Sequence, residues 1–135
     1  MIGYGFVALG GAFGSALRFA LDRWITQMMG SALPWGTIVI NIGGSFVIGL
    51  FTALFAGTSA ASTPIEIRQF VLVGVCGGFT TFSSFSLQTL TLFNANEPGR
   101  ALLNVMLSLT LCLTAVAAGY VLPGAFTTLS RGVGP

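Results

Sequence analysis

The charged residues of this sequence are few, and their spacing limits what the chain can fold into. There are five basic and three acidic residues among 135. They fall into small groups, and the stretches between the groups carry no charge: 1–17, 24–65, 69–96 and 101–130. A membrane-spanning helix needs roughly 20 apolar residues. Four spans therefore fit, the second stretch holding the end of one helix, a connection and a further helix.

Charged residues make up 6% of the chain, whereas soluble domains carry about 25%. So few charges cannot cover a water-facing surface, so the solvent must be a lipid bilayer. We predict an all-α integral membrane protein, a single domain over 1–135, with helices over 3–29, 34–55, 65–93 and 99–121. In the first of these, Gly10 and Gly14 have the GxxxG spacing that lets another backbone approach closely. Residues 57–64 are expected to form a polar loop and 94–98 a turn. The Gly-rich tail after Pro123 is expected to be frayed.

The residue types present exclude several classes of function. The net charge of +2 is too small and scattered for a nucleic-acid surface. Cys76 and Cys112 lie inside predicted spans, and without His or a CxxC motif they indicate neither a zinc site nor a disulfide framework. No acidic residue lies well inside a span, which argues against proton-coupled transport. The same absence argues against an intramembrane hydrolase, so we expect no enzyme.

The third uncharged stretch contains a segment that disfavours a continuous helix. Between Gly74 and Phe85 the sequence reads GVCGGFTTFSSF, with two adjacent glycines followed by two β-branched threonines. About half a span of apolar residues lies on each side. Broken helices at membrane depth build ion sites from freed carbonyls and half-helix ends. The alternative is a helix crossing mediated by glycine, without any site.

The basic residues give almost no preferred orientation in the membrane. With four spans, Arg68 and Arg131 lie on one side, and Arg18, Arg23 and Arg100 lie on the other. The positive-inside rule depends on an imbalance that is missing here. A chain without preference could insert both ways and pair with itself, which suggests a dual-topology antiparallel homodimer.

The polar groups left inside the predicted spans are neutral. Asn41 lies in the second span, on one face with Thr37, Ser45, Gly49 and Thr52. In the fourth span a polar stripe about 12 Å long is formed by Asn104, Ser108 and Cys112. Amide and hydroxyl groups can donate hydrogen bonds to an anion without carrying charge. The alternative is that they join helices to one another, as is common in membrane bundles.

Aromatic residues and one cation complete the candidate groups. Phe79, Phe82 and Phe85 follow at helical spacing and alternate with hydroxyl residues, among them Ser83. Aromatic rings have a positive edge, which a small anion can approach. Arg18 is the one cation expected within the membrane boundary. It could extend to the interface, or line a vestibule that attracts anions.

Three segments resemble the Fluc/CrcB family of fluoride channels. They are GGFTTFSSF at 77–85, GGAFGSALRF at 10–19 and WGTIVINIGGSFVIG at 35–49. The first is the most specific, and the others support it. The resemblance covers the first three spans motif by motif, and the fourth by length and polar stripe. It implies a fluoride-selective channel in the bacterial inner membrane, which exports fluoride passively to protect the cytoplasm.

The resemblance also implies an assembly and a set of site residues. The assembly is a dual-topology homodimer with two antiparallel pores. Backbone carbonyls of Gly77 and Thr80 from both chains would hold a structural Na⁺. The fluoride pathway would use Asn41 as donor, Phe82 and Phe85 through their ring edges, and Ser83, Asn104 and Ser108 as a polar track. The fourth span departs from the family pattern at Asn104, Cys112 and Val116.

Two other readings remain open from the sequence. A small multidrug-type exporter also has four helices, but it needs a carboxylate inside the membrane. A non-transporting membrane assembly subunit would explain the glycines and the apolar surface. It leaves the GGFTTFSSF segment, with its aromatic and hydroxyl face, without a reason.

Overall fold

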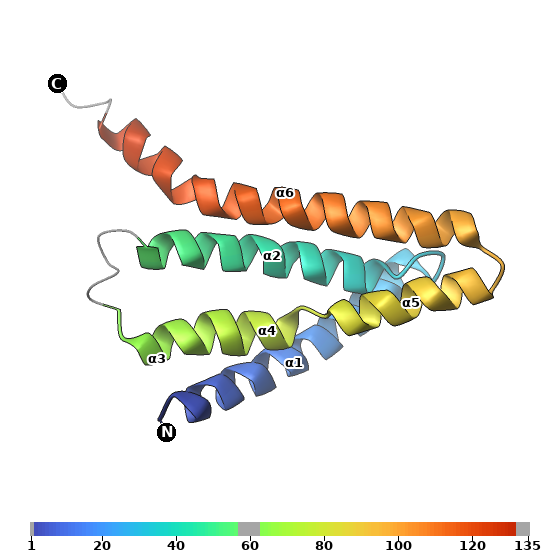
Figure 1. The fold of residues 1–135 in the computed structure, drawn as a ribbon, viewed down its shortest axis with the longest axis horizontal. Coiled ribbons are helices and arrows are strands. Elements are labelled where there is room, and N and C mark those ends of the chain that lie inside the picture. The colour runs from blue at the N-terminus through green and yellow to red at the C-terminus, as the bar shows by residue number, and fades with distance from the viewer. Residues whose placement is uncertain (1, 57–62, 132–135) are drawn as a thin grey trace.

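The computed structural model describes residues 2–56 and 63–131, and every regular element in this part of the chain is helical (Figure 1). The first two spans are single helices, α1 (Ile2–Met29) and α2 (Trp35–Ala56). The fourth is α6 (Pro98–Arg131). The third span is divided into four pieces: α3 (Ile65–Arg68), the π-helix η1 (Gln69–Val75), α4 (Cys76–Phe79) and α5 (Phe82–Asn94).

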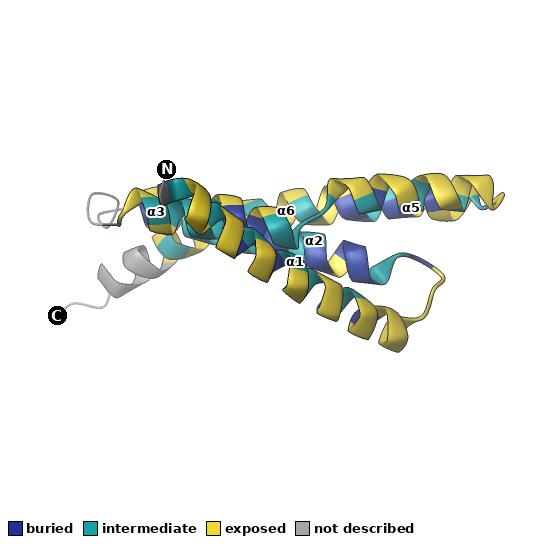
Figure 2. Ribbon diagram, turned by 90° about the horizontal axis from the view of Figure 1, so that it is seen from below, coloured by how far each residue is buried: buried dark blue, intermediate teal, exposed yellow. Residues whose placement is uncertain are grey.

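The described residues contain four helical stretches that are long and apolar enough to cross a membrane. At most 28% of the most apolar window in any of them is buried within the protomer. Large apolar residues are instead exposed along each stretch. Figure 2 shows how much of α1 and α5 is coloured as exposed. Apolar helices exposed in this way need lipid as solvent, so the chain is a multi-pass membrane protein, as the charge spacing predicts.

The spans alternate in direction. The start of α1, the end of α2, the start of α3 and the end of α6 lie at one end of the molecule (Figure 1). The connections between α1 and α2 and between α5 and α6 lie at the other end. The start of the first span and the end of the fourth therefore share one side of the membrane.

The predicted turn at 94–98 is confirmed, and its geometry has a clear local cause. Asn96 has a φ of 61°, a left-handed conformation that Asn tolerates better than most residues. Its N–H donates to Phe93 at 3.1 Å, and the N–H of Glu97 donates to Leu92 at 3.0 Å. This pair of bonds closes the end of α5. Pro98, which has no N–H, then begins α6.

The GxxxG spacing in α1 brings two backbones together. A Cβ on Gly10 would lie 2.6 Å from the carbonyl oxygen of Phe70, and a Cβ on Gly14 would overlap the carbonyl of Val75. On the other side, a Cβ on Gly74 would lie 2.9 Å from the Cα of Gly10. Only hydrogen side chains fit here, so α1 packs directly on η1 and α4.

A second glycine contact joins α2 to α6, the pair of helices with the most extensive contact in the fold. A Cβ on Gly49 would overlap the carbonyl of Val116, and a Cβ on Gly119 would overlap the carbonyl of Phe46. Val116, one of the departures on the fourth span, therefore contributes backbone to a helix contact.

Two expectations about helix ends differ from the structure. The fourth span does not end near Val121, because α6 continues through Pro123 to Arg131. The expected fraying after Pro123 is therefore wrong up to Arg131. A proline lacks one backbone donor, and a long helix can continue past it with a local kink. Most of the predicted loop at 57–64 lies outside the described residues.

Candidate functional site

The third span is interrupted at two threonines. Thr80 has φ −82° and ψ 158°, and Thr81 has φ −152° and ψ 110°, so both are extended. The preceding glycines, Gly77 and Gly78, are helical. The interruption therefore begins two residues after Gly78 and not at the glycines, because β-branched residues favour extended backbone.

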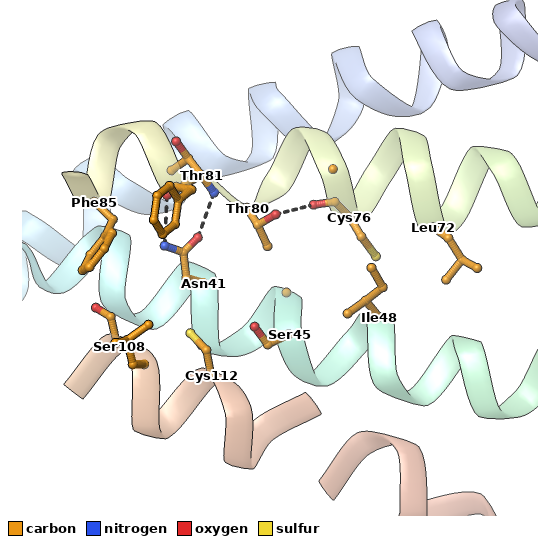
Figure 3. Close-up of a pocket in the computed structure, with 14 residues that line it drawn as sticks. Asn41, Ser45, Ile48, Leu72, Cys76, Thr80, Thr81, Phe85, Ser108 and Cys112 are labelled. Carbon is orange, nitrogen blue, oxygen red and sulfur yellow. Dashed lines mark hydrogen bonds between the residues drawn. The ribbon is translucent and has the colours of Figure 1, made fainter. Parts of the chain in front are cut away.

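The side chain of Asn41 binds both backbone groups of Thr81. Its Nδ2 donates to the carbonyl of Thr81 at 3.1 Å, and its Oδ1 accepts from the N–H of Thr81 at 2.8 Å (Figure 3). Asn41 lies on α2, so this pair of bonds joins the second span to the interruption in the third. A side-chain amide carries a donor and an acceptor side by side. It can therefore bind the N–H and the carbonyl of one extended residue, as the backbone of a paired β-strand would.

The backbone carbonyls of Gly77 and Thr80 lose their usual helical partners at the interruption. In a continuous helix the carbonyl of Gly77 would accept from the N–H of Thr81, but that N–H donates to Asn41. The carbonyl of Thr80 would accept from the N–H of Ser84, but that N–H donates to Oγ1 of Thr81 at 3.2 Å. These are the two carbonyls that the resemblance implies as Na⁺ ligands.

The carbonyl of Gly78, which follows Gly77, has different partners. Gly78 accepts from Oγ of Ser15 at 3.4 Å and from Nε of Arg18 at 3.3 Å. Arg18 is half-buried and carries its charge to the end of α4. The C-terminal end of a helix has a partial negative charge, which a cation stabilises. Arg18 thus lies at the interruption, while its place in a vestibule stays a prediction.

A cavity of about 310 Å³ opens beside the interruption, between α2, α4, α5 and α6 (Figure 3). Its lining has no acidic, basic or imidazole side chain. The polar side chains that line it are neutral: Asn41, Ser45, Thr80, Thr81 and Ser108, with the thiols Cys76 and Cys112. Such a lining can offer hydrogen bonds to an ion without holding it by a full opposite charge.

Two aromatic rings lie at the same cavity. Phe82 and Phe85 have ring centroids 5.3 Å apart and planes at 49°. Phe85 is 8% exposed, whereas Phe82 is 74% exposed in the protomer. Phe79 does not line the cavity. The expected row of three rings is interrupted because the extended residues separate Phe79 from the other two.

The polar stripe on α6 is divided in a similar way. Ser108 and Cys112 line the cavity, but Asn104 does not. Asn104 is fully buried and donates to Oγ1 of Thr89 at 2.8 Å. Ser83 is exposed, and its hydroxyl lies 3.2 Å from that of Thr81. Among the predicted pathway and Na⁺ residues, those that line the cavity are Asn41, Gly77, Thr80, Phe82, Phe85 and Ser108.

The sequence pattern marks Thr81 as one of the two threonines that disfavour a continuous helix, but not as a helix cap, and it gives no sign of Thr89. Thr81 begins α5 as its N-cap, with its Oγ1 accepting from the N–H of Ser84. A Thr three residues before a polar residue, directly ahead of an apolar run, is a recognised helix start and could have identified it. Thr89 has no comparable signal, because its role depends on its contact with Asn104 from another span.

Residues 5–120 match the model of a protein family described as CrcB-like protein, Camphor Resistance (CrcB). The fluoride-specific ion channel FluC of Rhodospirillum rubrum is 52% identical over 118 residues, which cover 87% of this chain and 92% of that protein. The fluoride-specific ion channel FluC of Opitutus terrae is also 52% identical, covering 87% and 89%. That of Paramagnetospirillum magneticum is 49% identical, covering 90% and 94%. This chain belongs to the CrcB family.

Proposed function

We propose that this chain forms a fluoride-selective ion channel that lets fluoride leave the cytoplasm passively and so lowers its toxicity. Relatives that are about half identical over most of the chain are named fluoride-specific ion channels. The observation that carries the proposal in the chain itself is the cavity beside Thr80 and Thr81, with neutral donors and two aromatic rings. The protein is a channel and not an enzyme.

The chemistry of the cavity suits a small and strongly hydrated anion. Nδ2 of Asn41 has two hydrogens, one of which goes to Thr81, so the other can be donated to fluoride. Ser108 offers a hydroxyl, and Phe82 and Phe85 offer ring edges. Several weak contacts of this kind let an ion enter and also leave, whereas a full positive charge would retain it. Ser83, beside Thr81, would extend the polar track.

A structural Na⁺ fits the carbonyls at the interruption. Gly77 and Thr80 both have carbonyls whose usual N–H partners are used elsewhere. Hard cations take oxygen ligands, and the described residues hold no group of three or more acidic, His or Cys side chains that would favour another metal. When bound by these carbonyls from two chains, Na⁺ would supply a fixed positive charge near the pathway. It would not be transported.

A second copy of the chain is the partner that this site needs. The cavity carries several neutral polar side chains, and Phe82 is largely exposed beside it, yet the surrounding spans are apolar. Irregular backbone at membrane depth must be covered by protein or line a water-filled cavity. The balanced arginines suggest that the copies insert in opposite orientations, which makes a dual-topology antiparallel homodimer with two pores in the bacterial inner membrane.

Fluoride release from liposomes tests the function directly. Purified protein is reconstituted, and efflux is read with a fluoride electrode beside a matched chloride assay. We expect fast fluoride release without chloride release. If folded, dimeric protein releases no fluoride, the channel proposal fails and an assembly subunit becomes the better reading. A tag on the C-terminus that reports a single orientation in cells would contradict the dual topology alone.

A further inference from the structure

Three buried polar atoms in the described part of the chain have no hydrogen-bond partner, and all three lie on α5 or α6. They are Oε1 of Gln88, Oδ1 of Asn104 and Oγ of Ser108. The Asn104 residue is 0% exposed and Ser108 is 6% exposed. Buried polar atoms without a partner are rare in proteins, and where they occur a water or a ligand commonly satisfies them.

The orientation of the Asn104 amide is determined by Thr89. The hydroxyl of Thr89 donates its one hydrogen to the carbonyl of Phe85 at 2.8 Å. Toward Asn104 it can therefore only accept, which it does from Nδ2 at 2.8 Å. Rotating the amide by 180° would place Oδ1 against an oxygen that has no hydrogen left to give. Oδ1 is consequently the end of the amide that remains without a partner.

An amide oxygen fixed in this way cannot bind an anion. Both Oδ1 and fluoride are hydrogen-bond acceptors, so direct contact between them is repulsive. A water molecule removes the conflict, because it donates one hydrogen to Oδ1 and keeps the other for a second acceptor. Ser108 follows one helical turn after Asn104. It is one of the residues that line the cavity, and its Oγ is buried without a hydrogen-bond partner. A water bound to Oδ1 of Asn104 would therefore lie about one helical turn along α6 from Ser108, a residue of the cavity lining.

We propose that Oδ1 of Asn104 holds a buried water molecule, and that fluoride passes this level of the pore in contact with that water and with Ser108 rather than with Asn104. The role in conduction rests on the proposed function, whereas the water site does not. Asn104 then acts as a positioning residue, which orients a water. Its side chain is fully buried and does not line the cavity, so neither end of its amide meets the ion directly.

The structural test is a pair of high-resolution crystal structures of the dimer, one grown with fluoride and one without it. Water and fluoride have the same number of electrons, so density alone does not separate them, but only fluoride depends on the salt. We expect a peak at hydrogen-bond distance from Oδ1 of Asn104 in both crystals, and its loss in Asn104→Leu. A peak that appears only with fluoride, or no peak in either crystal, would overturn the proposal.

The functional test measures fluoride efflux from liposomes. It uses variants that remove the Asn104 amide or the hydrogen bond to Thr89 that orients it. Asn104→Leu, which removes the acceptor, should lower fluoride flux by about tenfold, as expected for the loss of one hydrogen bond. Thr89→Val should free the amide to turn Nδ2 toward the water, and should change flux only if Asn104 is present. Thr110→Val is the control, because Thr110 lies on the exposed face of α6 and donates to Met106 in its own helix.

The outcomes separate the two proposals. If Thr89→Val changes flux equally with Asn104 and with Leu at that position, the orienting role is wrong. If the wild type conducts no fluoride but the salt-independent peak is present, the channel proposal fails and the water site stands.

Discussion

The two halves of the third span pack against different helices and by different means. The first half, α3 to α4, lies on α1 through glycines that bring the backbones into contact. The second half, α5, lies on α6, where the contact includes the polar pair of Thr89 and Asn104 and the unpartnered oxygens. Thr80 and Thr81 lie between the part of the span that packs on α1 and the part that packs on α6.

This difference suggests that the two halves have different roles. The glycine contacts between α1 and the first half form what we call the frame, whereas the second half carries polar atoms without partners. Close packing of small residues fixes helix positions within a membrane, where apolar side chains gain little by leaving lipid. Unpartnered polar atoms are costly in the same setting and are retained where they have a use. The first half of the span therefore fixes the positions of the helices, and the second half carries unpartnered polar atoms. The cavity draws on both halves, through Gly77 on one side and Phe85 on the other.

Substitution in the frame should have the largest effect. Gly14→Leu places a side chain where the carbonyl of Val75 lies, and backbone on both sides leaves no room to adjust. We expect a loss of more than about 3 kcal/mol of stability and little folded protein by size-exclusion chromatography. Gly5→Leu is the control, because a Cβ on Gly5 meets nothing within 4 Å. A well-folded Gly14→Leu variant would contradict the frame role.

Removal of the link between α2 and the interruption at Thr81 should have the second largest effect. Asn41→Leu leaves the N–H and carbonyl of Thr81 without partners, at about 1–3 kcal/mol for each group, and removes a donor from the cavity. We expect lower thermal stability and a fall in fluoride flux of at least about a hundredfold. Ser45→Ala, in the same cavity, should keep its stability. Equal melting temperatures for Asn41→Leu and wild type would contradict the link.

A change in the second half should affect transport and leave the fold intact. Phe82→Ile removes an aromatic edge at the cavity while keeping an apolar side chain. We expect fluoride flux to be abolished or strongly reduced in a protein that remains dimeric. Phe93→Ile serves for comparison, since Phe93 is on the same helix and 63% exposed. Wild-type flux from Phe82→Ile would remove the argument from aromatic edges.

The smallest effect is expected at the far end of α5. Glu97 accepts two bonds from Arg100, at 2.7 and 2.9 Å, but both side chains are well exposed. Exposed ion pairs contribute about 0–1 kcal/mol. Glu97→Ala should shift the melting temperature slightly and leave flux unchanged. A large loss of flux would mean that the pathway extends to this turn.

Much of the fold follows from the sequence because lipid imposes simple requirements. The uncharged stretches predict the four spans, and the GxxxG spacing predicts the close approach of α1, which the structure confirms at Gly10 and Gly14. The sequence also identifies Asn41, Phe82, Phe85 and Ser108, all of which line the cavity beside the interruption. Their roles in conduction stay predictions, as do the Na⁺ site and the dimer.

The sequence by itself determined the membrane class, the number of spans and the neutral chemistry of the interior, because these depend on composition and on spacing along one chain. Only the tertiary structure decided which of these polar groups have hydrogen-bond partners within the chain. Asn41 is bound to Thr81 forty residues away, and Asn104 is oriented by Thr89 from the neighbouring span. Hydrogen bonds between distant segments leave no pattern within either segment, and so they appear only when the helices are packed.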